Sequence, residues 1–364
     1  MNYVILTGSK NNSGDFLIKY QAKKIFTSLR PERNIIDINA FEHLSHDKLD
    51  IINSSKLLIL MGGPSLQTHM YPNIYKLTKN LNDIEVPIVT MGIGYKDYNY
   101  YWEGTKSYEL SDQTIKLLDK ISDSNYLSSV RDYSTLNVLK IYGYKNYLMT
   151  GCPALYETNF IENNDYLDQI KKIRFSIGVN YKISEAMCVQ MKNLITNLQK
   201  YFFNTDFKVL FHHQIKSSQG FLIDWLRKNN IQFLDVSGSA EKMIQEYESS
   251  DIHIGYRVHA HIFMSSINKP SILISEDSRA KGLSAVIGGL NFDGYLPIKF
   301  NLINKILLKL KLKSDIYIPV KNISRDVINH IEYEKKFKWP CMEIVNNNIH
   351  SHYKQMKNFI NQLP

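Results

Sequence analysis

The sequence has few cysteines and no long apolar run. Its three cysteines, Cys152, Cys188 and Cys341, show no Cys-x-x-Cys spacing in a chain of 364 residues, a pattern that predicts neither a disulfide framework nor a zinc site. No apolar stretch approaches the roughly 18 residues that a membrane-spanning helix needs. The chain also enters an apolar strand directly, without the charged and apolar regions of a signal peptide. We therefore expect a cytoplasmic protein, either free or touching the inner face of the membrane.

The positive charge of the chain is dispersed. The formal net charge is +9, but the lysines are scattered, and no basic run with interleaved aromatic residues occurs. This distribution argues against nucleic acid as a partner and favours acidic substrates or an anionic membrane surface. A hydrophobic fraction of 44% with 22% charged residues is typical of a folded protein. The length suits two domains of roughly 150–180 residues each.

The first half repeats a unit of strand, glycine-containing turn and helix. The predicted strands are Tyr3–Gly8, Ile35–Ile38, Lys56–Met61 and Pro87–Met91. The first is followed by Asn12, Gly14 and Asp15, where Asp15 is placed to cap a helix from Phe16 to about Leu29. None of the turns carries a dinucleotide or P-loop motif, so they do not predict a nucleotide. Each glycine can either serve the turn alone or bring the backbone close to a ligand.

The second half repeats this alternation after a polar linker at Glu157–Lys172. Its predicted strands lie near Phe175–Val179, Lys208–His212, Ile231–Leu234, Ile252–Gly255 and Ser271–Ile274. The predicted helices between them are Ser184–Phe203, Phe221–Lys228, Ala240–Ser249 and Ala260–Ile267. The whole pattern predicts an α/β protein of two Rossmann-like, doubly wound domains with a cleft between them, the GT-B style of architecture.

We expect the first domain at residues 1–160, on the acceptor side, and the second, with the donor or anion site, at 170–325. Residues 326–364 would form C-terminal helices, at Asp326–Phe337 and Asn346–Gln362, of which at least one packs back on the first domain. The segment Asn301–Lys313 has the spacing of an amphipathic helix. Its apolar face would pack on the second domain, or alternatively lie on anionic lipid.

The segment Asp251–Ser266 carries the most informative pattern. An apolar strand runs into a helix, and Arg257, His259 and His261 lie at the junction. The N-terminus of a helix offers unpaired backbone N–H groups and a positive dipole, and a guanidinium can bind a phosphate or carboxylate through two parallel hydrogen bonds. The junction therefore predicts an anion pocket. The alternative is a plain strand-to-helix turn with a surface arginine and a structural histidine.

Three further groups are candidate ligand contacts. His212 and His213 follow a strand at its carboxyl end, and we expect one of them to face the cleft. No Asp, Glu or Cys accompanies them at metal-ligand spacing, so we predict no metal site. Arg131 either binds substrate or forms a turn-and-cap pair with Asp132. The aromatic segment, a sugar platform or simply a packed surface loop, comprises Tyr95, Tyr98, Tyr100, Tyr101 and Trp102.

Short elements follow one another in a fixed order along residues 12–282. They are Asn12-Ser13-Gly14-Asp15, Gly62-Gly63, Gly92-Ile93-Gly94, Ser129-Val130-Arg131-Asp132, Gly151-Cys152-Pro153-Ala154, Ile177-Gly178-Val179-Asn180, His212-His213, Tyr256-Arg257-Val258-His259-Ala260 and Ala280-Lys281-Gly282. In this order they resemble the polysaccharide pyruvyl transferase family, with Arg-x-His-Ala as the most specific element. The resemblance implies a GT-B-like fold and transfer of pyruvate from phosphoenolpyruvate to a sugar, often as a ketal, without a metal or other cofactor.

The chain departs from the family pattern at two places. Cys152 precedes Pro153 where many members have Asp, and the basic residue expected after the first strand of the second domain comes only at Lys182, behind Asn180 and Tyr181. The resemblance implies that Arg257 and His259 form the heart of the donor site. The predicted substrate-binding residues around them are Lys281, His212, His213, Asn12, Gly14, Asp15, Gly62, Gly63, Gly94, Arg131 and Lys182.

Phosphoenolpyruvate has a phosphate and a carboxylate, and Arg257 and Lys281 can supply two cationic contacts for them. We expect His259 either to protonate the methylene carbon or only to hydrogen-bond the phosphate. The acceptor would be a saccharide or a lipid-linked saccharide of a cell-surface polysaccharide. One alternative is a GT-B glycosyltransferase that binds the diphosphate of a nucleotide-sugar donor. Another is a catalytically silent binding subunit of a polysaccharide assembly complex.

Overall fold

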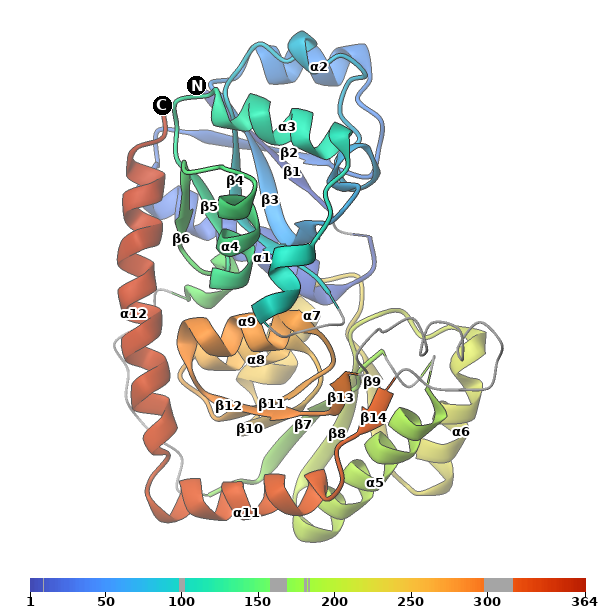
Figure 1. Ribbon diagram of the computed structural model, residues 1–364. Coiled ribbons are helices and arrows are strands. Elements are labelled where there is room, and N and C mark those ends of the chain that lie inside the picture. The colour runs from blue at the N-terminus through green and yellow to red at the C-terminus, as the bar shows by residue number, and fades with distance from the viewer. Residues whose placement is uncertain (9, 98–101, 158–168, 180–181, 183, 298–316) are drawn as a thin grey trace.

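Two parallel six-stranded sheets form the body of the protein in this computed structural model (Figure 1). The structure describes residues 1–8, 10–97, 102–157, 169–179, 182, 184–297 and 317–364. The first sheet has the order β2-β1-β3-β4-β5-β6. Its strands are β1 (Asn2–Thr7), β2 (Asn34–Asn39), β3 (Leu57–Leu66), β4 (Ile88–Tyr95), β5 (Ser128–Val130) and β6 (Tyr147–Met149). Its α-helices are α1 (Ser13–Leu29), α2 (His46–Asn53), α3 (Asp112–Ser122) and α4 (Tyr133–Ile141).

The second sheet has the order β12-β11-β10-β7-β8-β9. Its strands are β7 (Lys172–Ser176), β8 (Asp206–Phe211), β9 (Gln232–Asp235), β10 (Ile252–Gly255), β11 (Ser271–Ser275) and β12 (Leu290–Asp293). The helices between them are α5 (Glu185–Tyr201), α6 (Gly220–Lys228), α7 (Ala240–Glu248), α8 (Val258–Ser266) and α9 (Ser278–Ile287). A small antiparallel pair, β13 (Tyr295–Pro297) and β14 (Tyr317–Pro319), adjoins this domain.

The central strands are apolar on both faces because helices cover both sides of each parallel sheet. Leu57–Leu60 of β3 and Ile272–Ile274 of β11 are fully buried along consecutive positions. The structure therefore confirms the predicted fold class, two Rossmann-like domains in a GT-B-like arrangement.

Both sheets have a point at which the strand order reverses. In the first sheet this point lies between β1 and β3, and in the second between β7 and β10. Connections leave such a pair in opposite directions, so a crevice opens at the carboxyl ends of the two strands. The two crevices face each other, and the ends of β1, β3 and β10 contribute to one shared cavity.

Helix α8 lies between the two domains and is buried along its whole length. Each of its residues, Val258 to Ser266, is buried. It packs on β10 and β11 of its own domain and also on α1 and the Pro153–Leu155 turn of the first domain. A helix that is apolar all round, as this one is apart from its histidines and serines, is expected in the interior.

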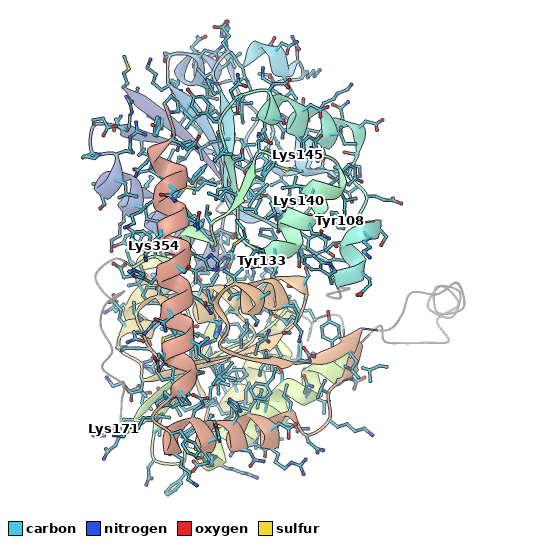
Figure 2. All side chains as sticks on the ribbon, turned by 60° about the vertical axis from the view of Figure 1, so that its left-hand side comes forward. Tyr108, Tyr133, Lys140, Lys145, Lys171 and Lys354 are labelled. Atoms are coloured by element: carbon cyan, nitrogen blue, oxygen red, sulfur yellow. The ribbon has the colours of Figure 1, made fainter. Side chains whose placement is uncertain are left out.

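The C-terminal helices tie the domains together. Helix α11 (Ile323–Lys336) packs on α5, and α12 (Pro340–Asn361) runs along one side of the molecule past both sheets (Figure 1). Arg30 of the first domain donates to the carbonyl oxygens of Leu363, at 2.7 Å, and Ile360, at 3.2 Å. In Figure 2, Tyr133 of α4 lies beside α12, and its ring centroid is 6.4 Å from that of His352. The prediction that a terminal helix packs back on the first domain is confirmed.

Several predicted boundaries were wrong. Asn12 rather than Asp15 caps α1, because its side chain accepts from the Gly14 N–H at 3.4 Å. Strands β3 and β4 continue through their glycines, since Gly63 still pairs with Ile93. Helix α8 begins at Val258 instead of Ala260, and α9 and β12 were not predicted.

Some predictions lie outside the described residues. They concern the amphipathic segment Asn301–Lys313, most of the linker at 157–172, the pair Asn180 and Tyr181, and Tyr98, Tyr100 and Tyr101. Within the described part of the chain, no helix is long and apolar enough to cross a membrane.

The contact of α12 with the first domain should contribute strongly to stability. Phe359 is 0% exposed on α12, so we expect Phe359→Ala to cost about 3–5 kcal/mol through lost burial and a cavity. Ile344 on the same helix is 58% exposed, and Ile344→Ala should change the stability by no more than about 0.5 kcal/mol. Urea unfolding of both variants measures the difference; similar losses would contradict tight docking of the helix end.

Candidate functional site: an anion-binding cavity between the domains

A cavity of about 280 Å³ lies between the carboxyl ends of the two sheets. The first domain contributes the ends of β1 and β3 and the start of α1 to its wall, and the second contributes the ends of β8 and β10 and the starts of α8 and α9. The predicted site residues that line it are Asn12, Asp15, Gly62, Gly63, His212, His213, Arg257 and His259. Topology therefore brings together residues that are up to about 250 positions apart in the sequence.

The two domains are joined by backbone hydrogen bonds at the edge of this cavity. The Ser13 N–H donates to the His212 carbonyl oxygen at 3.1 Å, and the Gly238 N–H donates to that of Asn11 at 3.0 Å. On another side, the Ser278 N–H donates to the Asp97 carbonyl oxygen at 2.9 Å. The loops that carry the polar residues of both domains are thus held in a defined relative position.

Arg257 and His259 lie where the sequence pattern predicted them. Arg257 is the residue before α8, and its backbone N–H donates to the Ser176 hydroxyl at 3.0 Å. His259 is 6% exposed, in the first turn of α8. Among the described residues, no hydrogen-bond partner contacts its buried Nε2 atom. The junction presents a guanidinium, an imidazole and the positive end of a helix to one cavity, as an anion site requires.

Gly14 lies directly against the second domain beside the site. A Cβ atom at this position would lie 2.0 Å from the Nδ1 atom of His259. The backbone of α1 therefore packs directly against the imidazole, and any side chain here would displace it. Gly14 itself does not line the cavity; it positions His259.

The second arginine of the cavity is Arg279, which was not among the predicted residues. It lies in the first turn of α9, and the Asp277 carboxylate fixes its guanidinium by accepting from Nε at 2.9 Å and from Nη2 at 2.7 Å. Lys281 does not line the cavity and instead pairs with Asp293. One sequence feature could have distinguished them: Asp277 is a good N-cap, which starts the helix at Ser278 and puts residue 279 in its first turn, at the cavity.

The cationic surroundings hold the cavity histidines neutral. Burial, with the nearby charges of Arg279, Arg131 and Arg257, lowers the pKa of His259 to about 3. Burial and Arg257 likewise lower the pKa of His213 to about 3. Imidazolium is therefore absent from these positions at neutral pH until negative charge enters the cavity.

His212 and His213 both line the cavity, but their surroundings differ. His213 is half-buried, whereas His212 is buried and its Nε2 atom lies 2.7 Å from the Tyr247 hydroxyl. His253, deeper in the domain, contacts the hydroxyl oxygens of Ser176 and Ser271, each at 2.7 Å. The Ser176 hydroxyl also accepts from the Arg257 N–H, so this polar cluster fixes the backbone before α8.

Arg131 and Gly94 form a structural pair behind the site. The Arg131 guanidinium is buried and donates to the Tyr95 carbonyl oxygen at 3.0 Å and to Asp132 at 3.1 Å. A Cβ atom at Gly94 would lie 1.9 Å from the Arg131 Nε atom, so only glycine fits there. Neither residue lines the cavity. The turn-and-cap alternative describes this pair, because Asp132 caps α4 through the Thr135 N–H at 2.7 Å.

The remaining predictions have mixed outcomes. Lys182 is exposed and does not line the cavity, although burial and the charge of Arg257 lower its pKa. Of the aromatic segment, Tyr95 is buried with an edge contact to Tyr108, and Trp102 is largely exposed. Throughout the described chain, no three His, Cys, Asp or Glu side chains gather as metal ligands would.

A family model described as polysaccharide pyruvyl transferase matches residues 12–278. The chain belongs to this family. It is therefore a transferase, and the matched range includes Arg257, His259 and the first residue of α9. No curated protein shows significant sequence similarity to this polysaccharide pyruvyl transferase family member.

Solved structures support the GT-B-like fold of this family member. It aligns with UDP-GlcNAc 2-epimerase from Neisseria meningitidis, bound to UDP-GlcNAc, over 100% of both chains, with a TM-score of 0.56 and 11% identity. It also aligns with an alpha-glucosyltransferase in complex with UDP over 99% of each chain, with a TM-score of 0.50 and 8% identity. At such low identities the similarity concerns the fold alone.

Other lining residues could not be predicted from sequence pattern. They are Thr7, Gly8, Ile18, Lys19, Phe41, Met61, Pro64, Ser65, Gln67, Ile74, Tyr75, Lys96, Val179, Tyr256 and Val258. Most come from the first domain and carry no motif. The signal that could have found some of them is topological, because the ends of strands that flank a reversal in strand order gather ligand contacts.

The different positions of Arg279 and Lys281 give a direct test of the anion site. Arg279→Met should weaken binding of inorganic phosphate about 10- to 100-fold, as loss of a charged hydrogen bond of roughly 1.5–3 kcal/mol implies. Lys281→Met should change it less than about twofold, because that side chain faces Asp293.

Isothermal titration at fixed ionic strength measures both affinities. Arg279→Lys keeps a charge beside the buried Asp277 and serves as the folding control; its affinity should fall between those of wild type and Arg279→Met. A larger loss in the Lys281 variant would contradict the assignment.

Proposed function

We propose that the protein transfers pyruvate from phosphoenolpyruvate to a pair of hydroxyl groups on a sugar, forming a ketal. The observation that carries this proposal is the pairing of Arg257 and Arg279 in one small cavity between two domains. Two guanidinium groups match the two anionic groups of phosphoenolpyruvate, its phosphate and its carboxylate. Membership in the polysaccharide pyruvyl transferase family supports the same donor.

The size of the cavity favours a small donor. Its volume of about 280 Å³ lies just below the range of roughly 300–1,000 Å³ that is typical of small-molecule sites. A donor of ten heavy atoms fits such a space more readily than a nucleotide-sugar does. The sugar acceptor would enter from the first domain, where Phe41, Gln67 and Tyr75 line the wall.

The residues of the second domain would activate the donor. Arg257 and Arg279 hold the phosphate and carboxylate, and the first-turn N–H groups of α8 add their dipole. The charge of the bound donor raises the pKa of the adjacent His259, which can then protonate the methylene carbon. The resulting cationic centre is attacked by a sugar hydroxyl, and phosphate leaves with the electron pair of its C–O bond before the second hydroxyl adds.

A nucleotide-sugar donor is the second candidate. The observation in its favour is the fold, which resembles an alpha-glucosyltransferase solved with UDP and an epimerase bound to UDP-GlcNAc. In that case Arg257 and Arg279 would hold the diphosphate. The acceptor in either case would be a saccharide or lipid-linked saccharide of a cell-surface polysaccharide, reached in the cytoplasm or at the inner membrane face, without nucleic acid or a cofactor.

A donor screen by thermal shift tests the proposal. A ligand that binds only the folded protein raises its Tm, by an amount equivalent to about 2.7 kcal/mol at 100 times Kd. We expect phosphoenolpyruvate to stabilise the wild type and UDP- or CMP-sugars to have no effect. Stabilisation by nucleotide-sugars alone would overturn the proposal, and no response to any donor would favour a silent binding subunit.

His259 should gain a proton when the donor binds. Its pKa of about 3 in the free protein makes it neutral at pH 7, and the donor's negative charges favour the imidazolium. Titrations of phosphoenolpyruvate in buffers of different ionisation enthalpy should therefore report proton uptake that is smaller in His259→Gln. That variant should keep donor affinity within a few-fold, while turnover falls by about 10²–10⁴-fold.

Equal losses of affinity and turnover, with unchanged proton uptake, would show that His259 only contacts the phosphate. The pH profile gives an independent check. The basic limb of the kcat profile should lie at higher pH than the pKa of His259 in the free protein, because saturating donor stabilises the protonated form of His259.

A further inference from the structure

Asp15 presents a carboxyl group to the cavity that no backbone group of α1 uses as a cap. It lies in the first turn of α1 and lines the cavity from the first domain. Asn12 caps the helix in its place, and the Asn12 side chain also favours the charged form of Asp15. The Asp15 carboxyl group therefore lines the site without serving as the helix cap.

The groups around Asp15 come from both domains. Arg279, Arg257 and Arg131 favour its charged form, and Cys152, from the turn after β6, lies near enough to be affected by its charge. On its own helix, Lys19 lies one turn further on and is engaged by Asp37 at 2.7 Å. His259, behind Gly14, is neutral in the free protein. Burial outweighs these cations and raises the pKa of Asp15 to about 6.

A carboxylate here does not suit a donor contact. Arg257 and Arg279 lie on the wall formed by the second domain, and a phosphate held there would be repelled by a charged Asp15. The first domain contributes Phe41 and Gln67, which suit a sugar, along with Lys96 and with Lys19, which Asp37 engages. Asp15 thus lies on the side from which a hydroxyl group would approach the donor.

We propose that Asp15 is a catalytic base that accepts the proton of the attacking sugar hydroxyl. This role rests on the proposed transfer to a sugar. In the step, the O–H bond breaks and its electron pair forms the new bond from the sugar oxygen to the cationic carbon. The proton passes to a carboxylate oxygen of Asp15. Asp15 passes this proton to the departing phosphate. His259, which has given its proton to the methylene carbon, accepts the proton of the second hydroxyl when that hydroxyl adds to complete the ketal.

The elevated pKa supports this role, because a carboxylate with a pKa nearer to 7 accepts a proton more readily than an ordinary one. Proton removal from an acceptor hydroxyl is equally needed if the donor is a nucleotide-sugar. The role of Asp15 can therefore hold even if phosphoenolpyruvate is not the donor, and the two proposals can be tested separately.

The kinetic test uses Asp15→Asn, which keeps shape and removes the base. With whichever donor the wild type turns over, kcat should fall by about 10²–10⁴-fold. Donor Kd should stay the same or become lower, because a negative charge beside the anion site is lost. The acidic limb of the wild-type kcat/KM profile, near pH 6, should disappear in the variant. Asp15→Glu should recover part of the activity.

A second readout does not depend on activity. The pKa of Asp15 is higher in the folded protein than its ordinary value of 3.8. Ionisation of Asp15 therefore lowers the free energy of unfolding. This destabilisation is absent below about pH 4, grows between about pH 4 and 6, and has its full size above about pH 6. Asp15→Asn should raise Tm relative to wild type at pH 7.5, and this gain should shrink as the pH falls toward 4.5.

Asp37 provides the matched control. It is half-buried, but the bonds from Lys19 at 2.7 Å and Thr7 at 2.7 Å outweigh burial and lower its pKa. Its ionisation stabilises the fold, so Asp37→Asn should lower Tm at pH 7.5, the opposite sign to Asp15→Asn.

The outcomes separate the two proposals. A wild type that uses a nucleotide-sugar but loses turnover in Asp15→Asn would overturn the pyruvate donor and uphold the base. A variant that keeps turnover, or that loses donor affinity as much as kcat, would overturn the base whatever the donor. A wild type inert with every donor and acceptor would overturn both. If Asp15→Asn raises Tm by the same amount at every pH, the raised pKa of the Asp15 carboxyl group would be contradicted.

Discussion

The complete burial of α8 between the two domains determines where everything else in the site lies. Val258–Ser266 packs on its own sheet and on α1 of the first domain, so its first turn cannot move without disturbing both. Polar side chains in such a position are costly unless they are satisfied. The Ser176 and His253 cluster meets that requirement below the helix. His259, whose Nε2 atom forms no hydrogen bond with any described residue, lines the cavity above it.

The electrostatics of the cavity follow from this burial. Burial, together with the charges of Arg279, Arg131 and Arg257, keeps the imidazole of His259 neutral at pH 7. A negative charge brought beside this imidazole would favour its protonated form. Desolvation lets one cavity hold a neutral histidine and a carboxyl group of raised pKa side by side.

The sequence was sufficient for the architecture and for the centre of the site. The alternation of apolar strands with helices predicted both sheets, and the crowding of Arg257 and His259 after a buried strand predicted that both residues lie at one site. The sequence was insufficient to assign site residues wherever the assignment depends on the exact residue at which a helix begins. Arg279 and Lys281 are two residues apart, and only the start of α9 at Ser278 determines which faces the cavity. The choice between Asn12 and Asp15 as the cap likewise depends on backbone geometry at four consecutive residues. Most of the other first-domain lining residues carry no motif, because they meet only through topology.

The path of α12 has a mechanical consequence. The chain passes from the first domain to the second between Glu157 and Gln169, and in the described part of the chain it returns along α12, whose end is held by Arg30. The covalent connection between the domains is thus supplemented at a second place, far along the chain from the first. The domains can separate only if α12 leaves the first domain and the interdomain backbone hydrogen bonds of Ser13 and Gly238 also break.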